Sequence, residues 1–280
     1  MIGKLIVFVH IEKCGGTTLI DVLRRSFGCN HVDMIPGSKR AMLIDQTDFD
    51  RLVRLRPAVC SIAGHSLRPY LELCGGGRDL QYYTLLRDPI RRYISDFKYF
   101  VDVLGYPPDF NTWLAREDRR NFQVKALAGV DDVSLSKRIL AERFSLFGFV
   151  EKYDLFFGHL RTLSLPYWLT PDFSVKNSTD DRSVRNSTEV DFERYAEAIE
   201  EANLKDIELY AFAQNLAKKR GWLAEPAGQM IKGSDHSRRL FERYNLVLNR
   251  LYRGLVYKPY VGRLPFLPHA LPVYKVYRGK

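Results

Sequence analysis

An apolar run near the amino end, which breaks into a glycine-containing loop, constrains the fold more than any other feature. Residues 4–9 read Lys-Leu-Ile-Val-Phe-Val, and residues 10–18 follow as His-Ile-Glu-Lys-Cys-Gly-Gly-Thr-Thr. A near-continuous apolar run is typical of a parallel strand covered on both faces. Paired glycines leave backbone amides open to a ligand, and the helix that follows favours a phosphate or sulfonate at its N-terminus. The sequence therefore predicts an anion-binding loop formed by Lys13, Gly15, Gly16, Thr17 and Thr18.

This loop lacks the order of a Walker A motif, because its lysine precedes the glycine pair. Glu12 brings a negative charge close to the predicted anion site, and we expect its side chain to point away. Cys14 lies near a helix N-terminus. It is either a small tolerated residue or a reactive thiol whose pKa is lowered there.

A second strand enters a second helix at residues 81–97. Asp88 is a good N-cap and Pro89 a good first helical residue. Apolar residues at 90, 93, 94, 97, 101 and 104 follow the spacing of a core-facing helix. Ser95 falls off that stripe and lies about two turns from the cap. We therefore expect Arg87 and Ser95 to bind one phosphate together.

These two motifs resemble those of PAPS-dependent carbohydrate sulfotransferases, closest to the heparan sulfate 2-O-sulfotransferase group and its bacterial relatives. Weaker similarities follow at residues 121–129, 147–154 and 203–210. The resemblance implies that the first loop holds the 5′-phosphosulfate of 3′-phosphoadenosine-5′-phosphosulfate (PAPS), and that Arg87 and Ser95 bind its 3′-phosphate. In relatives, a loop at the position of residues 176–188 folds over the donor. The expected donor-binding residues are Lys13, Cys14, Gly15, Gly16, Thr17, Thr18, Arg87, Ser95, Lys176, Arg182 and Arg185.

A third strand-like run, residues 59–63, ends in Gly64 and His65. In the related group a Gly-His pair at this place supplies the catalytic base. Ligands of open α/β sheets bind beyond the carboxyl ends of strands, where His10, His65 and Arg87 all fall. The resemblance implies in-line sulfuryl transfer that releases PAP. We expect Lys13 to neutralise the leaving oxygen and His65 to take the proton of the acceptor hydroxyl. We expect no metal, because no ligand-spaced motif occurs.

The length of 280 residues suits one enzyme domain. We predict an α/β, P-loop-like three-layer fold with a central, mostly parallel sheet flanked by helices. Residues 1–220 form the expected catalytic domain, and residues 221–280 form an extension packed on it. The helices predicted outside the two motifs cover residues 38–56, 109–129, 134–146, 191–220 and 238–253.

The net charge of +10 indicates anionic partners. No nucleic-acid-binding motif is present, so we expect a carbohydrate or glycolipid acceptor. The basic clusters, such as 91–92, read as solvated helix faces, and Arg116, Arg119 and Arg120 are candidates to line an acceptor groove. The basic amphipathic segment 238–253 either packs on the domain, pairs with a second subunit or touches a membrane surface.

The first strand begins within a few residues of Met1, and no apolar run reaches the length of a membrane span. We therefore expect a cytoplasmic protein. Two other functions stay open: a P-loop-type nucleotide kinase or hydrolase, and a polyanion-binding protein without catalysis. A kinase should carry a magnesium-binding aspartate on a later strand. Asp88 is the candidate for that role, but it is also the predicted helix cap.

Overall fold

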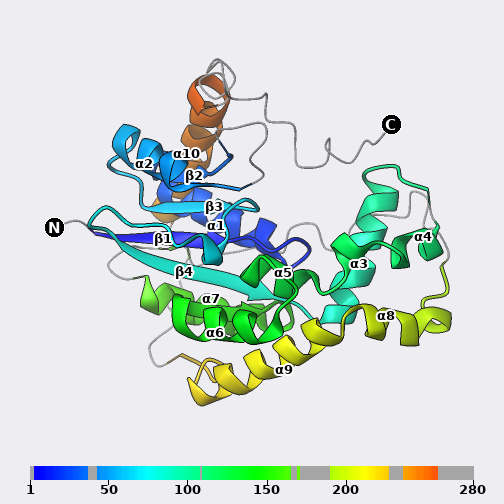
Figure 1. The fold of residues 1–280 in the computed structure, drawn as a ribbon. Coiled ribbons are helices and arrows are strands. Elements are labelled where there is room, and N and C mark those ends of the chain that lie inside the picture. Colours follow the sequence, from blue (N-terminus) through cyan, green and yellow to red (C-terminus); the bar gives the residue numbers. More distant parts are fainter. Residues whose placement is uncertain are drawn as a thin grey trace.

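The fold is built on a five-stranded sheet in which every strand is parallel to its neighbours (Figure 1). The computed structural model describes residues 3–36, 43–107, 109–164, 169–170, 190–226 and 236–257. The strand order is β2-β3-β1-β4-β5. The strands are β1 (Lys4–Val9), β2 (His31–Asp33), β3 (Ser61–Gly64), β4 (Asp79–Leu86) and β5 (Phe144–Phe149).

Helices cover both faces of this sheet, which confirms the predicted three-layer α/β class. Side chains alternate across a strand, and β5 shows which helix lies on which face. Gly148 faces Phe156 of α7, whereas Phe149 meets Tyr210 of α9 on the other side. The helices are α1 (Gly16–Phe27), α2 (Gln46–Leu55), α3 (Pro89–Asp102), α4 (Phe110–Leu114), α5 (Phe122–Ala128), α6 (Val133–Arg143), α7 (Tyr153–Leu163), α8 (Ala196–Ala202), α9 (Leu204–Lys219) and α10 (His236–Leu251).

The register of the central strands brings three chain segments to one edge of the sheet. Val9 at the end of β1 pairs with Gly64 of β3 and with Thr84 of β4. The Thr84 hydroxyl donates to the Val9 carbonyl at 2.9 Å, and the His10 amide donates to the Gly64 carbonyl at 3.3 Å. The segments that follow β1, β3 and β4 therefore start side by side.

A second, aromatic core lies beyond the carboxyl ends of the strands (Figure 1). It joins α3, α4 and α8, and the rings of Phe97, Phe110 and Trp113 meet edge to face in it. The Asp88 carboxylate accepts from the Arg91 amide at 2.9 Å and so caps α3 as predicted, with Pro89 as the first helical residue. This core fixes α3 at the edge where the predicted site lies.

Three predictions of secondary structure were wrong. Residues 43–45, expected in a helix over 38–56, precede α2, which begins at Gln46 because the Asp45 side chain caps it; residues 38–42 lie outside the described residues. Residues 144–146, expected to continue a helix from 134, belong to β5. Phe144 and Leu146 are buried there, and backbone pairing with β4 outweighs helical spacing in this stretch. Residues 109–129 form α4, a 3₁₀ turn at Glu117–Arg119 and α5 instead of one helix. The three-residue strand β2 was not predicted, because three residues are too few for a periodic pattern.

α10 packs against α1, and polar side chains make the contact. The Asn245 side-chain amide donates to the Arg25 carbonyl at 2.9 Å. Asn249, which is fully buried, donates to the carbonyls of Gly28 at 2.8 Å and His31 at 3.3 Å. The Asn245 amide thus satisfies a carbonyl left open in the last turn of α1, and the Asn249 amide joins the turn after α1 to the start of β2. No helix in the described ranges is long and apolar enough to cross a bilayer.

Replacing Asn249 with alanine removes the side-chain amide that donates to both carbonyls. The Gly28 carbonyl keeps its bond from the His31 amide, whereas the His31 carbonyl loses its side-chain donor. We expect Asn249→Ala to lower the free energy of unfolding by about 2 kcal/mol, measured by urea denaturation. Asn111→Ala, an exchange at an exposed position of α4, is the matched control and should change it by less than about 0.5 kcal/mol. Equal losses in the two variants would contradict this role of Asn249.

Candidate functional site

The loop between β1 and α1 leaves the N-terminus of α1 without a capping side chain. Gly15 occupies the cap position with φ of 69°, and no acidic residue lies in the first turn. By contrast, aspartate side chains cap α2, α3, α4 and α6. The uncapped amides and the helix dipole favour an anion at this end. Lys13 also has a positive φ, of 65°, a conformation that costs energy for any residue with a side chain.

Gly16 is required because a histidine ring occupies the space beside it. A Cβ at this position would lie 2.0 Å from the His10 ring. That ring stacks on the ring of His65, with centroids 3.9 Å apart. The missing side chain at Gly16 therefore allows a two-histidine stack to form directly under the loop.

His65 is held in one tautomer. Its Nδ1 lies 2.9 Å from the His10 carbonyl oxygen, which only accepts, so Nδ1 must carry the proton. The neutral ring then leaves Nε2 as a proton acceptor. Burial lowers the pKa of His65 below its usual 6.5, and Arg68 and Lys13 lower this pKa further, against an opposing effect of the Glu12 carboxylate. His65 is thus neutral at neutral pH.

Lys13 and Arg87, predicted at two separate motifs, come together at this edge. An Arg87 guanidinium nitrogen, Nη1, donates to the Lys13 carbonyl at 3.2 Å. The Lys13 ammonium nitrogen lies 4.1 Å from the centre of the Tyr99 ring, which extends from α3. The first loop, the end of β4 and α3 are therefore joined around two cationic side chains.

The Gln123 side chain holds the backbone of Arg87 through two hydrogen bonds. Its side-chain amide donates to the Arg87 carbonyl at 2.9 Å, and its oxygen accepts from the Arg87 amide at 3.0 Å. Asp206, fully buried in α9, accepts from the backbone amides of Gln123 and Val124 and so caps α5. Residues 121–129 and 203–210, the segments of weaker sequence similarity, thus hold Arg87 in place through Gln123 and Asp206.

Cys14 is not the reactive thiol that its place near a helix N-terminus allowed. Its side chain is buried and donates to the Gln123 oxygen at 3.5 Å. Burial, the largest effect, raises the pKa of Cys14 to about 12. Its amide donates to the Ile11 carbonyl at 3.3 Å. The alternative of a lowered pKa was therefore wrong, and the thiol stays protonated.

The other predicted donor-binding residues differ in their surroundings. Thr17 is exposed and Thr18 is buried in the first turn of α1. Ser95 lies in α3 and is only 7% exposed. Among the described residues no hydrogen bond joins Ser95 to Arg87. Lys176, Arg182 and Arg185 lie outside the described residues.

The arginines expected to line an acceptor groove are engaged within the protein. Arg119 is buried and pairs with Glu12 at 3.3 Å and with Asp96 at 3.5 Å. Glu12 thus has an internal counter-charge beside the site. Arg116 pairs with Asp118, and Arg120 with Glu117 and Glu201. Arg92 is also fully buried, against Asp96, so it does not belong to a solvated helix face.

Arg68 is a site residue that sequence reasoning missed. It follows β3 three residues after His65, and its charge acts on both His10 and His65. Its buried Nη1 atom has no hydrogen-bond partner in the described part of the chain. The only sequence signal was its place after a strand, beside the Gly-His pair.

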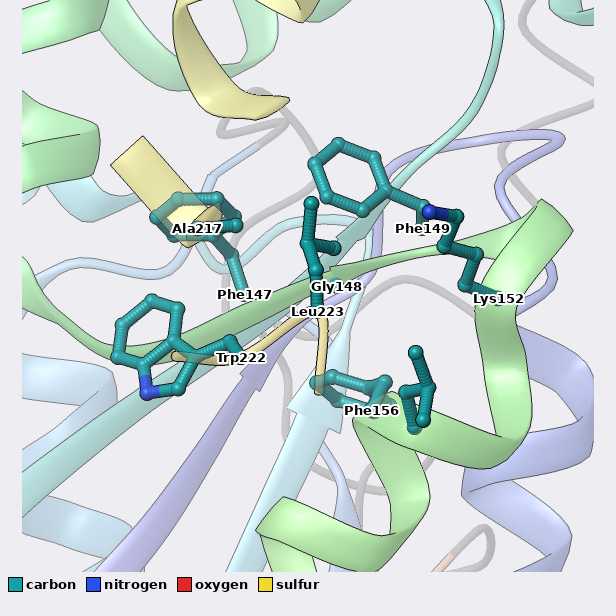
Figure 2. Close-up of a pocket in the computed structure, with 9 residues that line it drawn as sticks. Phe147, Gly148, Phe149, Lys152, Phe156, Ala217, Trp222 and Leu223 are labelled. Atoms are coloured by element: carbon teal, nitrogen blue, oxygen red, sulfur yellow. The ribbon is translucent and has the colours of Figure 1, made fainter. Parts of the chain in front are cut away.

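An apolar pocket beside β5 is separate from this site (Figure 2). The rings of Phe147, Phe156 and Trp222 line it, together with Leu223 and the stem of Lys152. Its enclosed volume of about 10 Å³ is near the minimum for a single water. None of its lining residues is a predicted site residue. Within the described residues, no group of three or more His, Cys, Asp and Glu is arranged to hold a metal ion.

The sequence matches no protein-family model and no curated protein.

Gly16→Ala tests whether the stack of His10 on His65 requires a glycine at position 16 of the loop. The added methyl overlaps the His10 ring, so we expect the free energy of unfolding to fall by about 1–3 kcal/mol and the histidine NMR signals to shift. Gly254→Ala is the matched control, because a Cβ there meets nothing within 4 Å. A Gly16→Ala protein as stable as the control, with unchanged histidine signals, would rule out this dependence.

Proposed function

We propose that the protein is a PAPS-dependent sulfotransferase that transfers a sulfuryl group to a hydroxyl of a carbohydrate or glycolipid. One observation carries the proposal: three parts of the chain meet at one edge of the sheet. They are the loop between β1 and the uncapped N-terminus of α1, His65 after β3, and Arg87 after β4. Anion binding, a neutral base and a second phosphate contact are the parts that this reaction needs. The resemblance of the two motifs to this class of enzyme supports the same reading.

In the proposed reaction the acceptor oxygen attacks sulfur, and the bond from sulfur to the 5′-phosphate oxygen of the donor breaks. Nε2 of His65 takes the acceptor proton, and Nδ1 stays bonded to the His10 carbonyl. Lys13 and the amides at the start of α1 stabilise the charge that develops on the leaving phosphate. The products are the sulfated acceptor and PAP.

The residues present fit such a donor. The open N-terminus of α1 has no acidic neighbour in its first turn, and Arg87 is braced by Gln123 at both its amide and its carbonyl. The unpartnered nitrogen of Arg68 offers a further contact for sulfonate or acceptor oxygens. Asp88, the aspartate considered for the metal of the kinase alternative, accepts from the Arg91 amide as the cap of α3, which favours the sulfotransferase proposal.

Arg87→Ala tests the donor. We expect PAP without magnesium to stabilise the wild-type protein by about 2.7 kcal/mol at 100 times its dissociation constant, and AMP to stabilise it far less. In Arg87→Ala the PAP-induced rise should vanish, because the 3′-phosphate loses its guanidinium partner. Thermal unfolding is the measurement, and each variant is compared with its own ligand-free midpoint.

Arg138→Ala, an exchange of an exposed arginine on α6, is the control and should keep the full PAP-induced rise. If ATP with magnesium stabilises the wild type as well as PAP does, the protein is a kinase-like enzyme and the proposal fails. If all polyanions stabilise it alike, with a strong dependence on salt, the protein binds polyanions without a donor site.

His65→Gln tests the base. We expect it to slow transfer of labelled sulfate from PAPS to a panel of unsulfated polysaccharides by about 10²–10⁴-fold. His159→Gln on α7 is the control and should be unaffected. In the wild type the pKa of His65 is lowered from 6.5, so the base form persists below that pH. The rate should therefore fall only as the pH drops through this lowered pKa, and a His65→Gln rate within threefold of wild type would exclude the role.

A further inference from the structure

α10 packs on the protein through its polar face and turns its apolar face outward. Glu242, Asn245 and Asn249 are buried against α1 and the turn that follows it. An apolar stripe runs along the opposite face, and each of its side chains is more than half exposed. The stripe consists of Leu240, Tyr244, Val247 and Leu251 of α10, together with Leu255 in the π-helical turn Tyr252–Tyr257 that follows it.

The spacing of the stripe is that of one helix face. Its first four members follow i, i+4, i+7 and i+11, which places them within a narrow sector at 100° per residue. A surface helix of a globular protein ordinarily buries such a stripe. Contiguous exposed apolar side chains of this kind mark an interaction surface.

The charges around the stripe decide which partner fits. Arg243 and Arg250 are exposed and lie along one edge of it. The only acidic residue between 236 and 257 is Glu242, and it is buried beside Arg25 at 3.4 Å. If two stripes paired face to face, α10 would offer no acidic residue to oppose the arginines of the other copy. A surface that combines apolar chains with negative headgroups complements both features.

We propose that the α10 stripe docks on an anionic lipid surface, with Val247 and Leu251 entering the apolar layer and Arg243 and Arg250 contacting headgroup phosphates. The helix stays on α1 when it does so, because its polar face already satisfies the carbonyls at the end of α1. The inference rests on α10 alone and does not require the proposed sulfuryl transfer.

Flotation of the full-length chain with vesicles tests the surface. We expect it to float with vesicles that contain phosphatidylglycerol and not with vesicles of phosphatidylcholine alone. Val247→Glu with Leu251→Glu should lower the bound fraction about tenfold or more. Val130→Glu with Leu204→Glu, at exposed apolar positions outside α10, changes the net charge equally and should bind like the wild type.

The arginine contacts are tested separately. Arg243→Gln with Arg250→Gln should weaken binding about tenfold, whereas Arg54→Gln with Arg138→Gln, at exposed positions outside α10, should have much less effect.

Equal loss in test and control pairs, equal binding to neutral vesicles, or no binding at all would overturn the proposal. So would a dimer in light scattering that Val247→Glu with Leu251→Glu dissociates, because the occupant would then be a second copy. Arg87→Ala should float like the wild type, which separates this test from that of the donor site.

Discussion

The parallel pairing of β1 with β3 on one side and β4 on the other is the constraint on which the site depends. Because Val9 pairs with both Gly64 and Thr84, the chain leaves the sheet at three neighbouring points on the same edge. One point is followed by a glycine loop, one by a histidine and one by an arginine. A shift of register by one residue in either pairing would reverse which face each side chain meets, and the His10–His65 stack could not form.

The gathering of cations at this edge requires buried anions nearby. Glu12 and Asp96 both pair with the buried Arg119, and Asp96 also pairs with Arg92. An unpaired buried charge costs several kcal/mol of folding free energy. These carboxylates therefore offset the cost of burying the arginines. Arg87 and Arg68, by contrast, form no salt bridge with a carboxylate among the described residues: Arg87 donates to the Lys13 carbonyl, and Arg68 Nη1 has no hydrogen-bond partner there.

Much of the fold could be predicted from local signals. The apolar run of β1, the Asp88-Pro89 start of α3 and the Gly64-His65 strand end all carry their information within a few residues, and the structure agrees with each. β5 was missed because Phe144, Leu146 and Phe147 gain their burial from pairing with β4, which no local pattern records. The same holds for the site: His10, Gln123 and Arg68 act through neighbours distant in sequence, and the internal pairing of Arg119 depends on Glu12, 107 residues away.

The orientation of α10 shows that hydrogen bonds to backbone carbonyls can decide which face of a helix packs on the protein, even where the apolar pattern favours the other face. Its apolar stripe has the spacing of a buried helix face, yet two asparagines hold the opposite face against the protein. The end of α1 leaves carbonyls that need donors, and Gly28, with φ of 52°, bends the chain so that Asn245 fits closely beside it. An apolar side chain there would leave these carbonyls unpaired at about 1–3 kcal/mol each. The polar face is therefore the one that packs on α1, and the apolar side chains of α10 lie exposed among the described residues.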